Sequence, residues 1–502
     1  MMPGLKNQSS ILKSVISSAL LIFLASCNHH PPGGIAEGVD LPSITPDYTG
    51  IKIPKNIAPL SFMVNEAGKK FYAEINGGDG NVLKISSRQP LISIPESKWK
   101  NLLEENKSGL ISISVYTLDE NKNWKRFRTI TDTLAEEPID KYLTYRLLFP
   151  GYEQWNELSI NQRDLESYTE RAVIENTVAE DNCVNCHSYN NGHSDDFLFH
   201  TRGSLGGTYF YNDGKLEKAN LKTTEMLNGA VYPRWHPSGR YVAFSSNKIV
   251  QLFHAADNKK IEVMDLESSL VIYDRDKNEM FPVDFPDKEK FMDTYPEWSP
   301  DGRSMYFCRA AQIGRDYDYK DIKYDLYRAD FNPEDRSVSD PVLVFDASGK
   351  GKSISFPRIS PDGKYLVMTM QDYGCFPIWH KETDLWSVDL GNSMVSRLSL
   401  NSDSTDSYHS WSSNGRWLVF SSKRGDGLRA RPYIAYFSKS GRSSKPFILP
   451  QADPSFYDSF LKTFNLPEFS TTKIKLRPGT IRKVSGSAPS QSRWAGDKVQ
   501  EK

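Results

Sequence analysis

The residues of this sequence best placed to do chemistry together are Cys183, Cys186 and His187, in the stretch DNCVNCHSYN at 181–190. The CxxCH spacing is typical of covalent c-type haem attachment, in which two thiols form thioethers and the adjacent imidazole binds the iron. On a helix, residues three and four apart share one face, so both thiols would meet one edge of a macrocycle. The spacing therefore predicts one covalent haem c on Cys183 and Cys186, with His187 as an axial iron ligand.

Three other interpretations of this stretch stay open. The two cysteines could form a disulfide or a dithiol redox pair, although neither needs a histidine at the next position. A zinc site would need a fourth ligand and reduced thiolates. Coincidence would place two of the five cysteines and one of the nine histidines within five residues. Haem is the interpretation that uses all three side chains.

A haem at this place also needs a ligand, or an open position, on the opposite side of the iron. We expect His200 as the distal iron ligand, because His193 follows His187 too closely for the chain to wrap around the ring. Met226 is the second candidate, and an open sixth position is the third. Arg202 is expected to pair with a haem propionate. The structural alternatives are that His200 belongs to a strand and that Met226 is a packing residue.

The N-terminus predicts export from the cytoplasm. Basic residues precede an apolar run at 15–25, which is shorter than the ~20 residues that a membrane-spanning helix needs. The run ends in LASC at 24–27 and resembles the lipobox of bacterial lipoproteins, which implies cleavage before Cys27 and acylation of that cysteine. We expect a signal peptide over 1–26 and a lipid anchor in the cell envelope, on the periplasmic side of the outer membrane. An ordinary signal peptide is the alternative.

Composition narrows the class of protein. The 502 residues are 25% charged and 38% hydrophobic with a net charge of −1, as in an ordinary globular chain of two or three domains. Nothing in this balance favours nucleic-acid binding. Outside the cytoplasm the cysteines would lie in an oxidising compartment, where disulfides persist, and Cys308 could then pair with Cys375. A free buried thiol is the alternative for Cys308.

The residue composition and the spacing of apolar residues change several times along the chain. Residues 27–50 are rich in Pro and Gly and predict a flexible tether. Over 51–140, short alternating runs such as LISISVYTL predict a small β-sandwich-like domain. Over 141–200, helical spacing of Leu165, Tyr168 and Ala172 predicts a helical segment that carries the haem motif. The last stretch, 466–502, predicts a disordered basic tail, because its residues 471–502 include eight basic and only two acidic ones.

The strongest organisational pattern is a repeat array. Four segments align without gaps: YPRWHPSGRYVAFSS from 232, YPEWSPDGRSMYFCR from 295, FPRISPDGKYLVMTM from 356 and YHSWSSNGRWLVFSS from 408. Each has a turn in which a glycine takes a positive φ angle, followed by an apolar strand of the kind buried on both faces. Such repeats predict a β-propeller of five or six blades over 201–465, and they resemble the TolB-type propeller family.

Taken together, the lipobox, YRLLFPGYEQWNELSINQRDLESYTE, CVNCHSYN, FHTRGSLGGT and the repeats resemble a family of bacterial envelope lipoproteins that join a cytochrome c-like segment to a propeller. The resemblance implies a mainly β architecture and a haem, but no substrate. We expect electron transfer or redox sensing at the membrane, with the propeller as the docking platform for a protein partner. The alternative is a haem-free propeller that binds a protein or glycan, with Cys183 and Cys186 in a disulfide. A hydrolase is disfavoured because no GxSxG occurs.

Overall fold

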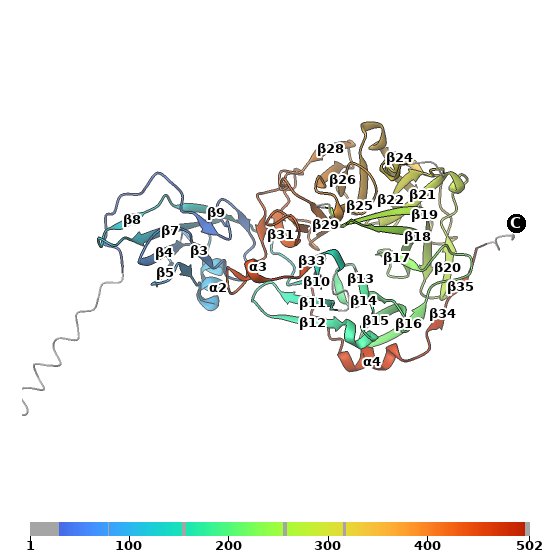
Figure 1. Cartoon of the computed structure of the whole chain (residues 1–502), viewed down its shortest axis with the longest axis horizontal. Helices are drawn as coiled ribbons and strands as arrows, with labels where there is room; N and C mark the ends of the chain where they lie inside the picture. The colour runs from blue at the N-terminus through green and yellow to red at the C-terminus, as the bar shows by residue number, and fades with distance from the viewer. Residues whose placement is uncertain (1–29, 79, 153–156, 255–258, 315–317, 497–502) are drawn as a thin grey trace, which may run out of the picture.

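The computed structural model describes residues 30–78, 80–152, 157–254, 259–314 and 318–496. These residues form two parts, a smaller N-terminal β domain and a larger ring of sheets (Figure 1). The protein is mainly β, as predicted. Cys27 and the predicted signal peptide lie outside the described residues.

The N-terminal domain packs a small sheet against a larger one. The large sheet has the order β2-β9-β7-β4-β5, with β8 paired to β7, and the small sheet has the order β1-β3-β6. Ile111, Ile113 and Val115 are buried on β7, in the alternation predicted for a half-buried strand. The elements are β1 (Ile44–Thr45), β2 (Lys52–Ile53), β3 (Phe62–Val64), β4 (Lys70–Asn76), β5 (Val82–Ser87), β6 (Leu91–Ile92), α2 (Glu96–Glu105), β7 (Leu110–Leu118), β8 (Trp124–Arg126) and β9 (Ile130–Leu134).

The ring is a β-propeller with six blades, each built on four antiparallel strands. Blade 1 consists of β10 (Tyr142–Leu148), β11 (Ser159–Asp164), β12 (Glu170–Glu175) and β33 (Thr463–Ser470); blade 2 of β13 (Val184–Asn190), β14 (His193–Thr201), β15 (Gly207–Asn212) and β16 (Lys215–Asn220); blade 3 of β17 (Ala230–Trp235), β18 (Tyr241–Phe253), β19 (Ile261–Asp274) and β20 (Glu279–Pro282). Blade 4 consists of β21 (Phe291–Trp298), β22 (Ser304–Ala311), β23 (Asp325–Asp330) and β24 (Val342–Phe345); blade 5 of β25 (Ser353–Ile359), β26 (Tyr365–Gln371), β27 (Asp384–Asp389) and β28 (Met394–Arg397); blade 6 of β29 (Asp406–Trp411), β30 (Trp417–Ser422), β31 (Arg431–Tyr436) and β32 (Phe447–Ile448).

The repeat turns have the predicted backbone. Gly239, Gly302, Gly363 and Gly415 have φ angles of 71°, 71°, 69° and 65°, which L-residues with a Cβ rarely adopt. The strands that follow these turns are buried along most of their length, because each is sandwiched between neighbouring blades.

The predicted helical segment at 141–200 is wrong. This part of the chain forms β10 to β14 and supplies most of blade 1 and half of blade 2. Leu165 and Ala172 do not share a helix face, because Leu165 follows β11 and Ala172 lies on β12. The apparent helical spacing arose from Leu165 and Tyr168 in the turn between β11 and β12 and from Ala172 on β12. The propeller therefore begins at 142 and not at 201.

The prediction of a disordered tail from 466 is also wrong for the described part of that tail. Residues 466–470 belong to β33, which pairs with β10 and closes the ring with the C-terminal end of the chain. Beyond it, α4 (Pro478–Ser485) packs on blades 1 and 2, and Ile474, Leu476 and Ile481 are buried. The strands β34 (Ser490–Gln491) and β35 (Arg493–Trp494) extend blades 2 and 3. The prediction of disorder rested on the number of basic residues and did not take these buried apolar residues into account.

The N-terminal domain is joined to blade 6. Trp417 of β30 is fully buried, and its indole N–H donates to the Glu137 carbonyl at 3.1 Å. Asp140 accepts hydrogen bonds from the Ser413 backbone N–H and hydroxyl. A short helix, α3 (Phe456–Ser459), covers the same region. One apolar core therefore runs from the N-terminal sheets into blade 6.

Candidate functional site

The innermost strand of every blade carries the same irregularity. One residue per strand has a left-handed φ angle, and the pairing register shifts around it, as in a β-bulge. These residues are Cys186 (φ 52°), Tyr232 (55°), Tyr295 (51°), Phe356 (57°), Tyr408 (48°) and Leu466 (50°). We call them the bulge ring. CHSY at 186–189 is therefore the blade 2 copy of the repeat that YPRW and YHSW represent in blades 3 and 6.

The bulge ring lines a cavity of about 370 Å³ on the propeller axis, which we call the mouth cavity. Cys183 and Cys186 both line it. In a regular strand, residues three apart point to opposite faces, but the bulge at Cys186 breaks that alternation. Cys183, directly before β13, and Cys186, on β13, therefore line one cavity, whereas a helix was predicted for both.

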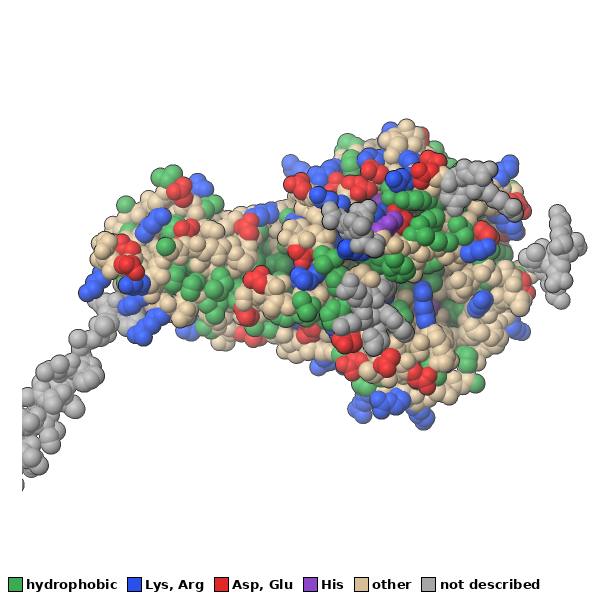
Figure 2. Space-filling model, in the orientation of Figure 1, with side chains coloured by type: hydrophobic (Ala, Val, Ile, Leu, Met, Phe, Trp, Pro, Cys, Tyr) green, Lys and Arg blue, Asp and Glu red, His purple; other side chains and the backbone are tan. Residues whose placement is uncertain are grey.

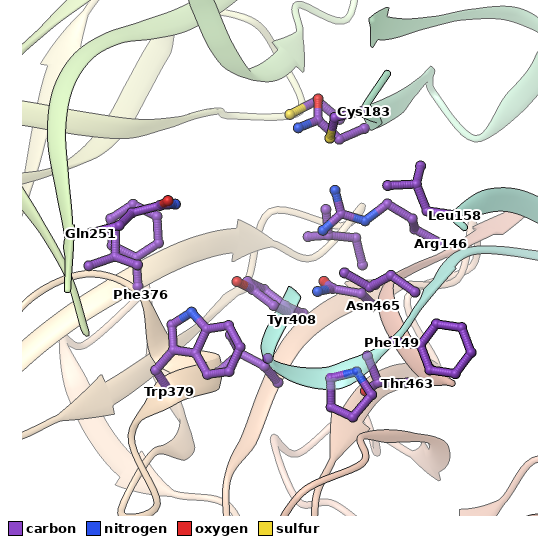
Figure 3. Close-up of a pocket in the computed structure, with 18 of the residues that line it drawn as sticks. Arg146, Phe149, Leu158, Cys183, Gln251, Phe376, Trp379, Tyr408, Thr463 and Asn465 are labelled. Atoms are coloured by element: carbon purple, nitrogen blue, oxygen red, sulfur yellow. The ribbon is translucent and has the colours of Figure 1, made fainter. Parts of the chain in front are cut away.

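Aromatic side chains form a large part of the walls of the mouth cavity. Figure 3 shows Cys183 on one side of the cavity, Trp379 and Tyr408 across from it, and Phe376 and Gln251 at a third side. The aromatic lining residues are Phe149, Tyr232, Phe253, Tyr295, Phe356, Phe376, Trp379 and Tyr408. A cavity of this size with few polar groups is typical of a site for an organic ligand.

The charged groups of the mouth cavity all have one sign. Arg146, Arg202 and Lys423 line it, and no Asp or Glu is among its described lining residues. Arg146 is 6% exposed and forms no ion pair with any residue that the structure describes. Lys423 donates to the Ile378 carbonyl at 2.7 Å, and burial lowers the pKa of its amine to about 8. The cavity therefore suits a large apolar ligand that carries negative charge.

His187 lies one layer deeper, in an inner cavity of about 50 Å³ that it lines together with Cys186, Arg234, Arg358 and Glu468. Within the described part of the chain, neither ring nitrogen of His187 has a hydrogen-bond partner, and its Nε2 is 3.9 Å from a Glu468 oxygen. Burial, with a smaller contribution from Arg146, lowers the pKa of the imidazole to about 3. The ring is therefore neutral, which is the form that binds a metal.

Four charged residues lie at or beside this inner cavity, at equivalent positions of four blades. Arg234, Glu297, Arg358 and Glu468 lie two residues after the bulge on their strands. Arg234 and Arg358 both pair with Glu297, at 2.5 and 3.5 Å. Burial raises the pKa of Glu468 to about 7. The inner cavity therefore has charges of both signs in its lining, unlike the mouth cavity.

The remaining predicted site residues lie elsewhere. Arg202 lines the mouth cavity, and its role as a propionate partner stays a prediction. His200, on β14, lines a second cavity in which neither Cys183 nor Cys186 takes part. Met226 is buried in an apolar cluster with Leu198, Phe210 and other residues of blades 2 and 3. The structure thus separates both predicted distal ligands from the two thiols.

The four cysteines of the described residues are free thiols. Cys308 and Cys375 are buried in one apolar cluster without a disulfide, and the Cys375 thiol donates to Asp265 at 3.1 Å. No cluster of three or more His, Cys, Asp or Glu suited to a metal ion occurs in the described part of the chain. No helix among these residues is both long and apolar enough to cross a membrane.

Part of the mouth cavity fits the chemistry of a haem, since it holds two thiols and cations that could pair with carboxylates. His187 does not line this cavity, and only Cys186 lines both the mouth cavity and the inner cavity that contains His187. Arg146, Lys423, Trp379 and Phe376 were missed in the sequence analysis, because the ring closure brings them together from distant segments. The bulge-ring aromatics could have been found, since they begin each of the four aligned repeat segments.

No family model and no curated protein sequence matches this chain. Similar solved structures include TolB from Acinetobacter baumannii, at 14% identity and a TM-score of 0.43, covering 75% of this chain and 85% of that chain. A hypothetical selenium-binding protein from Sulfolobus tokodaii matches at 10% identity and 0.41, covering 82% and 95%. An auxiliary nutrient binding protein from Bacteroides thetaiotaomicron matches at 11% and 0.35, covering 81% and 99%. The likenesses concern the fold, which the six sheets already establish.

Proposed function

We propose that this protein is a lipid-anchored c-type haem protein of the cell envelope that acts in electron transfer or redox sensing. One haem would be bonded to Cys183 and Cys186 and would occupy the mouth cavity. The observation that carries the proposal is that both thiols of the CxxCH motif line one aromatic cavity of about 370 Å³. When bound, a haem supplies a one-electron couple at its iron.

The side chains around the cavity have separate tasks in this proposal. His187 is the candidate axial ligand, because its neutral ring has no partner among the described residues. Arg146, Arg202 and Lys423 would pair with the two propionates, which also compensates the cost of burying Arg146 and Lys423 without a counter-charge. The aromatic walls would exclude water, which affects the reduction potential.

A partner surface adjoins the cavity. Phe253 and Leu428 line the mouth cavity but are 67% and 40% exposed. Figure 2 shows hydrophobic side chains gathered near the centre of the propeller face, within a rim of charged residues. An apolar centre with a polar rim is the usual anatomy of a protein docking site. We propose that a redox partner docks on this face.

The test is expression of the full chain in a host with c-type haem maturation. We expect haem staining on a denaturing gel and an alkaline pyridine haemochrome spectrum, both lost in Cys183→Ser/Cys186→Ser. The matched control is Cys308→Ser/Cys375→Ser, which removes the two thiols outside the site and should keep the haem. A colourless wild-type protein with Cys183 linked to Cys186 would refute the proposal.

The alternative is a haem-free propeller that binds a protein or glycan. One observation favours it: Cys186 and His187 occupy the bulge and the following position, which blade 6 fills with Tyr408 and His409. The repeat alone could then account for the Cys-His pair. The same staining experiment separates the two proposals, since the repeat does not account for a covalent haem.

The lipid anchor at Cys27 is also part of the proposal. It would place the haem at the membrane surface and would confine the search for a partner to the envelope. We expect wild-type protein in the membrane fraction and Cys27→Ala protein in the soluble fraction or retained with its leader. Equal fractionation of the two proteins would remove the anchor from the proposal without affecting the haem.

A further inference from the structure

A second cavity of about 510 Å³ lies between blades 2 and 3, and we call it the side cavity. Blade 2 contributes Asn185, His200 and Thr208 to its wall, and blade 3 contributes Val231 and Asn247. It shares Asn185 and Arg202 with the mouth cavity, so the two adjoin. Neither thiol lines it, and the proposed function assigns it no role.

The side cavity has a one-sided charge. Arg202 and Lys222 line it, whereas no Asp or Glu is among its described lining residues. Neither cation forms an ion pair with another residue in the described ranges, although such pairs are common elsewhere on this chain. The Asn185 amide adds a polar group to this wall, whereas the amides of Asn228 and Asn247 already donate to the Asn247 carbonyl and to Asp265. Guanidinium, ammonium and amide donors together are the groups that bind oxyanions.

A buried histidine points to a ligand independently of these surface charges. His200 is 7% exposed, and its Nδ1 is 2.9 Å from the Thr208 hydroxyl. Its Nε2 is buried and has no hydrogen-bond partner in the described part of the chain. An unpaired buried polar atom is costly, by about 1–3 kcal/mol, unless a ligand or water satisfies it. With the Thr208 hydroxyl donating to Nδ1, the neutral ring carries its proton on Nε2 and can donate to a bound anion.

We propose that the side cavity binds the oxygen atoms of a small oxyanion, a carboxylate or phosphate group, through Arg202, Lys222 and His200. Binding of a free anion here goes beyond the proposed haem function, because these residues require no thiol and no iron, whereas binding of a haem propionate would rest on that function. The anion has two sources: a free small molecule, or a propionate of a haem held in the adjoining mouth cavity through the shared Arg202.

The test is titration of the haem-free Cys183→Ser/Cys186→Ser chain with inorganic phosphate and with succinate, followed by calorimetry at constant ionic strength. We expect saturable binding of at least one of the two anions. Arg202→Gln/Lys222→Gln should weaken it at least tenfold, and His200→Leu should weaken it as well. The control Lys277→Gln/Lys439→Gln removes two exposed cations elsewhere and should bind like the parent chain.

The haem-loaded protein distinguishes the two sources. Binding to both haem-free and haem-loaded chains identifies a free anion, and binding to the haem-free chain alone identifies a propionate. No saturable binding to the haem-free chain, or equal binding by Arg202→Gln/Lys222→Gln, overturns the proposal. If a variant fails to fold, the parent chain and the Lys277→Gln/Lys439→Gln control chain are compared by ³¹P NMR. We expect both chains to broaden the phosphate resonance. Broadening by neither chain overturns the proposal. Because this arm needs no haem, failure of the haem proposal leaves its result unchanged.

Discussion

His187 of blade 2 and His409 of blade 6 occupy the same position in the propeller repeat, directly after the bulge residue of an innermost strand. Burial lowers the pKa of both imidazoles to about 3. Their partners differ. The Nε2 of His409 is 2.8 Å from the Val367 carbonyl, whereas neither nitrogen of His187 has a hydrogen-bond partner among the described residues. The fold thus gives His409 a close hydrogen bond, whereas the His187 ring lies near the Leu466 backbone and the Glu468 carboxylate without so close a bond.

This difference makes the two histidines a matched pair for testing axial ligation. In haem-loaded protein, we expect His187→Phe to shift the Soret band, because an iron ligand is lost, and His409→Phe to leave that band in place. The His409 variant should lose about 1 kcal/mol of stability with its hydrogen bond. Absorption spectra of the ferric and ferrous forms make the comparison. Identical spectra for the His187 variant and the wild type would remove His187 as the ligand.

The left-handed backbone at Cys186 gives a second prediction. Asn tolerates this conformation, whereas a β-branched side chain does not. In the haem-free chain we expect Cys186→Val to be less stable than Cys186→Asn by about 1–2 kcal/mol, although valine is the better residue for a strand. Urea unfolding of both variants measures the difference. Equal stabilities would mean that the bulge relaxes at this position.

Much of the fold could be predicted, because the repeats encode it locally. Each of the four aligned segments contains its own turn glycine and its own doubly buried strand, so a short window is sufficient. Blades 1 and 2 lack that turn sequence, and Leu165, Tyr168 and Ala172, in and after the turn between β11 and β12, imitate a helical spacing. CHSY belongs to the repeat, but its match to YHSW at 408–411 becomes evident only when the innermost strands are superposed.

The candidate site was predictable only in part, for a topological reason. Cys183, Cys186 and His187 are neighbours in sequence, so their spacing identifies them. Arg146 and Lys423 come from blades 1 and 6, and ring closure by β33 brings them to one cavity. No local sequence pattern indicates that the ring closes in this way, because closure depends on pairing between strands more than three hundred residues apart.

Ring closure itself can be tested by truncation. A chain that ends at residue 462 lacks β33, so the edge of β10 is left unpaired. It also lacks the buried Phe464 and Phe469, so the side chains that pack against them become exposed. We expect this chain to lose its cooperative thermal transition and to become sensitive to limited proteolysis. A chain that ends at 486 keeps β33 and α4 and loses only β34 and β35. Retention of a cooperative transition by the shorter chain would contradict the closure.

Lys423 gives a prediction about pH. Its ordinary pKa is 10.5, and burial lowers the pKa to about 8 in the folded protein. Between these values the unfolded chain holds a proton that the folded chain has lost, so in the haem-free protein the free energy of unfolding should rise with pH from about 8 to 10.5. Below pH 8 both states are protonated, and burial of the charge is fully unfavourable.

Replacing Lys423 by methionine should therefore stabilise the haem-free protein at pH 7. The shift corresponds to roughly 3 kcal/mol, and loss of the hydrogen bond to Ile378 offsets about 1 kcal/mol, which leaves a gain of about 2 kcal/mol. Urea unfolding at pH 7.0 and 9.5 measures it, with the exposed Lys439→Met as control. In haem-loaded protein a propionate beside Lys423 would favour the charged amine, so the gain should shrink or reverse. A variant as stable as wild type at pH 7 and equally dependent on pH would show that the Lys423 amine is solvated in the folded protein.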